Sequence, residues 1–104
     1  MSWTRVGKAG EVRDGDIRTY FIGDRRIAVA RDGDALYAFD DECRHQRCSL
    51  SDGDVEDGTV MCPCHAGTYD LTTGAVVSGP PPEPIGVYPV AEEDDELRIE
   101  VDGA

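Results

Sequence analysis

Two short segments that hold every cysteine and histidine of the chain constrain its fold more than any other feature. The first runs from Cys43 to Cys48, and the second runs from Cys62 to His65. They read as C-x-H, sixteen intervening residues and C-x-x-H, so each segment offers one thiolate and one imidazole as metal ligands. The predicted ligands are Cys43, His45, Cys62 and His65, which leaves Cys48 and Cys64 as a spare pair.

Two chemistries use two cysteines and two histidines. One is a tetrahedral structural zinc, and the other is a [2Fe–2S] cluster in which two histidines replace two cysteines on one iron. Common zinc fingers pair like with like within each segment, whereas both segments here are mixed. The mixed order favours the cluster, with one iron held by Cys43 and Cys62 and the other by His45 and His65. The alternative is a non-redox binding module held together by zinc.

The residues in and around both segments resemble the cluster-binding motifs of Rieske proteins. The resemblance rests on Cys43-Arg44-His45, on the run from Cys62 to Asp70, and on Gly79-Pro80-Pro81-Pro82, which is similar to the family's proline loop. From Trp3 onward, nearly the whole chain resembles a Rieske-type ferredoxin. This resemblance implies a Rieske [2Fe–2S] cofactor. It also implies an all-β Rieske fold, an antiparallel β-sandwich with a cluster-binding subdomain of two ligand loops and a proline loop.

The spare cysteines carry a second resemblance. Cys48 and Cys64 stand where Rieske proteins of cytochrome bc complexes have a disulfide that ties the two cluster loops together. The resemblance therefore implies a Cys48–Cys64 disulfide. Two alternatives stay open: a pair of free thiols, because cytosolic disulfides are usually reduced, or a redox switch formed by the same pair.

Three further residues are implied by the family to tune or shield the cluster. In high-potential respiratory members a serine hydroxyl and a tyrosine hydroxyl donate to sulfur atoms of the site. Gly67 stands at the serine position and lacks a donor, whereas Tyr69 stands at the tyrosine position. One donor of two predicts a reduction potential between those of dioxygenase ferredoxins and respiratory proteins. Pro81, within the proline loop, is expected to help exclude water.

The residues that flank His45 predict the kind of partner that the cluster meets. In respiratory members the position of Gln46 is typically leucine, which is part of an apolar tip at the quinol site. Here Arg44, Gln46 and Arg47 make this tip polar and basic. Such a tip suits a wet, transient contact with another protein, although plain exposed loop residues would look the same.

The length and the apolar pattern predict one β-rich domain over residues 1–104. The resemblance to Rieske proteins implies a cluster-binding subdomain at about 41–84. Glycine and proline are spread along the chain, and no stretch shows sustained helical periodicity. Short apolar runs between turn residues predict strands. These are residues 3–6, 17–22, 27–30, 36–39, 59–61, 68–71, 75–77, 85–90 and 97–101.

The charge balance excludes several classes of partner. The formal net charge is −12, which argues against nucleic acid, whose phosphates require lysine and arginine, and against anionic membranes. No apolar run approaches the length of a membrane span. The first residues, Met1 to Arg5, contain no signal-peptide core. A soluble, cytoplasmic monomer is therefore expected.

These features together predict a soluble one-electron carrier rather than an enzyme. No nucleotide-binding glycine motif is present, and both histidines are committed as ligands, so none remains for catalysis. The resemblance implies a flavin reductase as electron donor and a terminal oxygenase, or another redox protein, as acceptor. An alternative is the small electron-transfer subunit of a larger reductase or oxidase, of the nitrite-reductase or arsenite-oxidase type.

Overall fold

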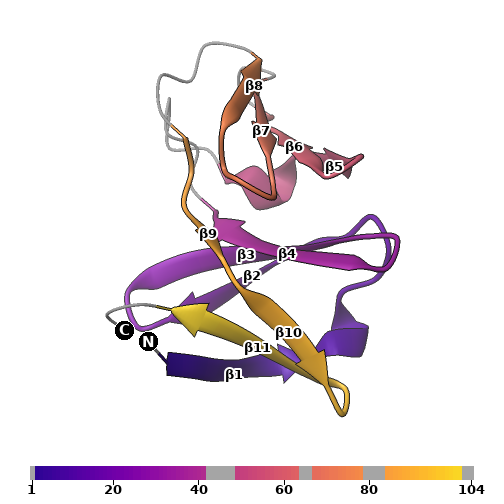
Figure 1. Cartoon of the computed structure of the whole chain (residues 1–104), viewed down its shortest axis with the longest axis vertical. Coiled ribbons are helices and arrows are strands. Elements are labelled where there is room, and N and C mark those ends of the chain that lie inside the picture. The colour runs from indigo at the N-terminus through magenta and orange to yellow at the C-terminus, as the bar shows by residue number, and fades with distance from the viewer. Residues whose placement is uncertain (1, 42–48, 64–66, 79–83, 102–104) are drawn as a thin grey trace.

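The computed structural model describes residues 2–41, 49–63, 67–78 and 84–101, and these ranges form strands joined by turns (Figure 1). Every strand pair is antiparallel, which confirms the predicted all-β fold. Within the same ranges, no helix has the length and apolar character that crossing a bilayer requires. The strands are β1 (Ser2–Lys8), β2 (Ile17–Ile22), β3 (Arg25–Asp32), β4 (Ala35–Asp40), β5 (Asp54–Glu56), β6 (Thr59–Met61), β7 (Thr68–Asp70), β8 (Val76–Ser78), β9 (Val87–Tyr88), β10 (Val90–Glu93) and β11 (Glu96–Val101), with short 3₁₀ turns η1 (Ala9–Glu11) and η2 (Leu50–Asp52).

The strands form a larger base and a smaller sheet that stands on it. The base consists of a sheet ordered β1-β11-β10 and a sheet ordered β2-β3-β4-β9, and the small sheet is ordered β5-β6-β7-β8. Figure 1 shows the small sheet above β2, β3 and β4, with β1, β10 and β11 on the opposite side. Ser2 pairs with Val101, so both described ends of the chain lie in the base. The small sheet is thus inserted between β4 and β9.

Strand β3 separates two hydrophobic cores. Side chains alternate between the two faces of a strand, and here Ala28 and Ala30 join the core beneath the small sheet, whereas Ile27 and Val29 join the core of the base. Both faces are therefore buried, which explains why this stretch reads as an unbroken apolar run. In β11, by contrast, only one face is buried, which matches the alternation of apolar and charged residues along this strand.

The structure divides one predicted strand and adds another. Residues 85–90 were expected to form one closing strand, but β9 pairs with β4 in one sheet and β10 pairs with β11 in the other. Pro89 lies between them, and its missing N–H suits a point where the chain leaves one sheet for the next. Asp54–Glu56, which lies outside the predicted strands, forms the edge strand β5.

Candidate metal centre

Cys62 is the one predicted ligand that lies within the described residues, and it is fully buried. It follows β6 directly, where Met61 is 40% exposed and Val60 is buried, so the alternation of the strand turns Cys62 inward. Its backbone N–H donates a hydrogen bond to the carbonyl oxygen of Gly67 at 2.7 Å. This hydrogen bond joins the two residues at which the second ligand segment leaves the small sheet and returns to it.

Tyr69 lies on the same buried face. It pairs with Val60 across β6 and β7, and its side chain is fully buried in the core that also holds Cys62. The structure thus places Tyr69 beside the strand that leads into a predicted ligand. Burial of a tyrosine usually requires a partner for its hydroxyl, which fits the donor role that the family resemblance implies.

The described ends of all three predicted cluster segments meet in one apolar core. Leu50 follows the first ligand segment, Cys62 opens the second, and Ile85 follows the proline segment, and all three belong to the same buried group. The remaining members of that group are Ala28, Ala30, Phe39, Val60, Tyr69 and Leu71. A thiolate ligand emerging from such a water-poor core fits an iron–sulfur cluster, because burial and the surrounding shell control solvent access to a metal site.

The other predicted site residues lie outside the described parts of the chain, so the structure does not test them. Residues 2–41, 49–63, 67–78 and 84–101 contain no group of three or more metal-ligating side chains, and only one proposed ligand falls within those ranges. The untested residues are Cys43, Arg44, His45, Gln46, Arg47, Cys48, Cys64, His65 and Pro81.

The charge of the small sheet is a feature that the pattern of motifs did not reveal. Between Arg47 and Arg98 the sequence has no lysine or arginine, so only acidic charge lies along this stretch. Asp54, Glu56 and Asp57 line a shallow hollow on the exposed face of the small sheet together with Met61. The absence of lysine and arginine over this range could have predicted the acidic character of the small sheet from the sequence.

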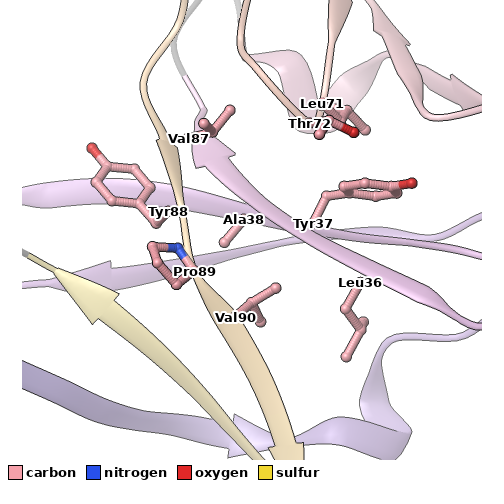
Figure 2. Close-up of a pocket in the computed structure, with 9 residues that line it drawn as sticks. All are labelled: Leu36, Tyr37, Ala38, Leu71, Thr72, Val87, Tyr88, Pro89 and Val90. Atoms are coloured by element: carbon pink, nitrogen blue, oxygen red, sulfur yellow. The ribbon is translucent and has the colours of Figure 1, made fainter.

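An apolar groove lies where the small sheet meets the base (Figure 2). Figure 2 shows Leu71 and Thr72 on one side, Tyr37 of β4 beside them, and Val87 and Val90 along β9 and β10. None of the nine lining residues is a cysteine, histidine, aspartate or glutamate. The groove is therefore a seam between two parts of the fold and not a second metal site.

Comparisons with known proteins give consistent results. A family model described as Rieske [2Fe-2S] domain matches residues 2–89. The anthranilate 1,2-dioxygenase ferredoxin subunit of Burkholderia cepacia is 39% identical over 99 residues, covering 95% of this chain and 92% of that protein. The ferredoxin of carbazole 1,9a-dioxygenase from Nocardioides aromaticivorans IC177 superposes with a TM-score of 0.88 at 27% identity, covering 95% and 97%. A chain in a complex of reduced oxygenase and oxidized ferredoxin in carbazole 1,9a-dioxygenase gives 0.85 at 35% identity, covering 93% and 91%.

Proposed function

The chain belongs to the Rieske [2Fe–2S] domain family, and on that premise we propose that it carries single electrons to a terminal oxygenase. Its cofactor is a Rieske [2Fe–2S] cluster, which when bound accepts and returns one electron. The chain is an electron-transfer component and not itself a substrate-transforming enzyme. The observation that carries the proposal is the match, over nearly its whole length, to ferredoxin subunits of dioxygenases.

The proposed ligands are Cys43, His45, Cys62 and His65. The burial of Cys62 supports this set, because its thiolate is shielded from water by Leu50, Val60 and Tyr69 in the core beneath the small sheet. An apolar shell of this kind limits solvent access to a bound cluster. Gly67, whose carbonyl accepts the Cys62 N–H, closes the base of the second segment.

The experiment that tests the ligand set combines metal analysis with electron paramagnetic resonance after one-electron reduction. Iron with a Rieske-type signal is expected, whereas stoichiometric zinc without iron would overturn the proposal. Serine replacements supply a matched control within the same two segments: Cys43→Ser and Cys62→Ser should abolish the signal. Cys48→Ser and Cys64→Ser should retain it, and a lost signal there would contradict the assignment.

The proposed electron donor is a flavin reductase, and the proposed acceptor is a terminal oxygenase. Support comes from the solved complex of an oxygenase with a ferredoxin of similar sequence. We place Arg44, Gln46 and Arg47 at the contact, where their basic charge contrasts with the acidic small sheet. Replacing Arg44 and Arg47 by glutamine should slow electron transfer to the oxygenase in stopped-flow absorbance. Replacing Arg5, in β1 of the base, should leave that rate unchanged.

A Cys48–Cys64 disulfide is part of the proposal. Alkylation of unfolded protein under non-reducing conditions, followed by mass spectrometry, should leave both residues unmodified. Cys48→Ser should then expose Cys64 to alkylation. Modification of both cysteines in the wild-type protein would show instead that they are thiols.

We also propose that residues 1–104 form one domain, with a cluster-binding subdomain at about 41–84, and that the protein is a soluble cytoplasmic monomer. The insertion of the small sheet between β4 and β9 supports this organisation, because both flanking parts of the chain complete the same base. The net charge of −12 supports solubility. Light scattering during gel filtration tests the monomer, and fractionation of the producing cells tests the compartment.

A further inference from the structure

Asp41 is a buried carboxylate that precedes the first ligand segment, and it accepts hydrogen bonds from residues that follow the segment. Its side chain is 1% exposed. Its carbonyl oxygen accepts the Leu50 N–H at 2.6 Å, and its Oδ1 accepts the Ser51 N–H at 2.7 Å. Asp41 precedes the segment, whereas Leu50 and Ser51 follow it. One residue therefore closes the base of the segment with two hydrogen bonds.

An arginine of the neighbouring strand holds Asp41 in place. Arg26 Nε of β3 lies 2.9 Å from Asp41 Oδ2, an ion pair without the alignment of a hydrogen bond. The Asp41 N–H also donates to the carbonyl oxygen of Arg26 at 3.2 Å. A buried carboxylate is costly unless it is paired and hydrogen-bonded, and this arrangement meets both conditions. The carboxylate is thus fixed against the rigid strand β3.

Asp40, the preceding residue, serves a different segment. Its Oδ2 accepts the Gly86 N–H at 3.1 Å, and its own N–H donates to the Gly86 carbonyl at 2.9 Å. Its Oδ1 accepts the Tyr88 hydroxyl proton at 2.5 Å. Gly86 follows the proline segment by a few residues. Asp40 therefore ties the returning end of that segment to the end of β4.

We propose that the dipeptide Asp40-Asp41 positions the cluster by fixing the first ligand segment and the proline segment relative to each other. Two adjacent residues at the end of one strand thereby set the spacing of two of the three cluster segments. The inference rests on the proposed cluster function. Neither residue is assigned as a ligand; both are positioning residues that act through backbone groups of the segments they hold.

The test compares variants that separate the position of the carboxylate from its charge. Asp41→Glu keeps the charge but moves the oxygens outward by one methylene. Asp41→Asn removes the charge but keeps an oxygen that can accept the Ser51 N–H. Asp32→Glu is the matched control, because Asp32 Oδ2 also accepts a backbone N–H, that of Gly58, at 2.7 Å. Gly58 lies at the end of β6 opposite to Cys62.

The readouts are the g-values of the reduced cluster and the rate at which a chelator removes its iron. Asp41→Glu is expected to shift the g-values and to speed iron loss about 10-fold, the lower end of the change in metal affinity when an outer-shell partner is lost. Asp32→Glu should retain wild-type g-values. Asp41→Asn keeps an acceptor for the Ser51 N–H but loses the ion pair with Arg26, so its effect should be smaller than that of Asp41→Glu. Asp40→Glu tests the contact with Gly86 by the same readouts. If Asp41→Glu does not fold, the result for Asp40→Glu alone tests the inference.

Three results would overturn the inference. Wild-type g-values and iron-loss rates in both Asp40→Glu and Asp41→Glu would show that these two positions do not matter to the cluster. An equal effect of Asp32→Glu would show only general destabilisation. An equal effect of Asp41→Asn would show that charge and not position is responsible. A wild-type protein without a Rieske signal would refute the proposed function instead, so the two failures are distinguishable.

Discussion

Replacing Gly74 by alanine tests how tightly the end of the proline segment is held against the small sheet. Gly74 has a φ of +82°, and its carbonyl oxygen accepts the Ile85 N–H at 2.9 Å. A β-carbon at this position would lie 2.1 Å from the carbonyl oxygen of Ile85, against roughly 3.3 Å for the closest ordinary C···O contacts. The obstacle is backbone, and Ile85 is buried, so the segment cannot move aside without opening the core.

The expected cost has three parts. A left-handed conformation costs an alanine about 1 kcal/mol, overpacking a core costs about 1–3 kcal/mol, and losing the Ile85 hydrogen bond costs about 1 kcal/mol. Reduced freedom of the unfolded chain returns about 0.5 kcal/mol. Gly74→Ala should therefore destabilise the protein by about 2.5–4.5 kcal/mol, a fall in melting temperature of about 10–35 °C for a domain of this size.

Gly33→Ala is the matched control. Gly33 also has a positive φ, +62°, but a β-carbon there would meet nothing within 4 Å. Gly33→Ala should therefore lower the stability only through the left-handed backbone conformation, by about 0.5–1 kcal/mol once the reduced freedom of the unfolded chain is included. Thermal unfolding followed by circular dichroism measures both variants. Equal shifts for Gly74→Ala and Gly33→Ala would refute the close packing of Gly74 against Ile85.

Three further predictions concern the core, the cluster and the response to pH. Leu50→Ala should destabilise the protein by about 2–5 kcal/mol, because Leu50 is fully buried. Val77→Ala, at a position that is 58% exposed, should change the stability by about 0.5 kcal/mol or less. Similar losses of stability for the two variants in urea unfolding would contradict the packing of Leu50. Tyr69→Phe should lower the reduction potential in a potentiometric titration, and an unchanged midpoint would remove Tyr69 from the tuning role. Burial, followed by the hydrogen bond to Asp40, raises the pKa of Tyr88 from 10.0 to about 12. The folded protein therefore holds this proton more tightly than the unfolded chain, and the contribution is full below pH 10 and lost as the pH rises towards 12. Tyr88→Phe should show a smaller fall in stability across that window.

The cofactor was predictable from the sequence because its ligands are chemically distinctive. Two mixed cysteine and histidine segments restrict the possible metals, and the family match confirms the Rieske cluster that they predicted. The strands predicted at residues 17–22, 27–30 and 36–39 are likewise confirmed as β2, β3 and β4, which pair in that order. Apolar periodicity and turn residues are local properties, and they can be read one stretch at a time. The four ligands as a set remain a prediction.

The roles of Asp40 and Asp41 were decided only by the tertiary structure. In the sequence they belong to the acidic run Asp40-Asp41-Glu42, which leads into the first ligand segment. The fold buries one of these aspartates against Arg26 and bonds the other to Gly86, 46 positions away in the chain. Hydrogen-bond partners that distant depend on how whole sheets pack, and no local pattern records them.

The same reason explains the division of the predicted strand at Pro89. The sequence by itself determined the cluster chemistry, the β class and most strands, because side-chain chemistry and period-2 alternation are properties of short stretches. Only the tertiary structure decided that β9 joins β4 while β10 joins β11, and that β3 lies between two cores. Each of those choices buries apolar surface contributed by segments far apart in the chain, so its free energy depends on all of them at once.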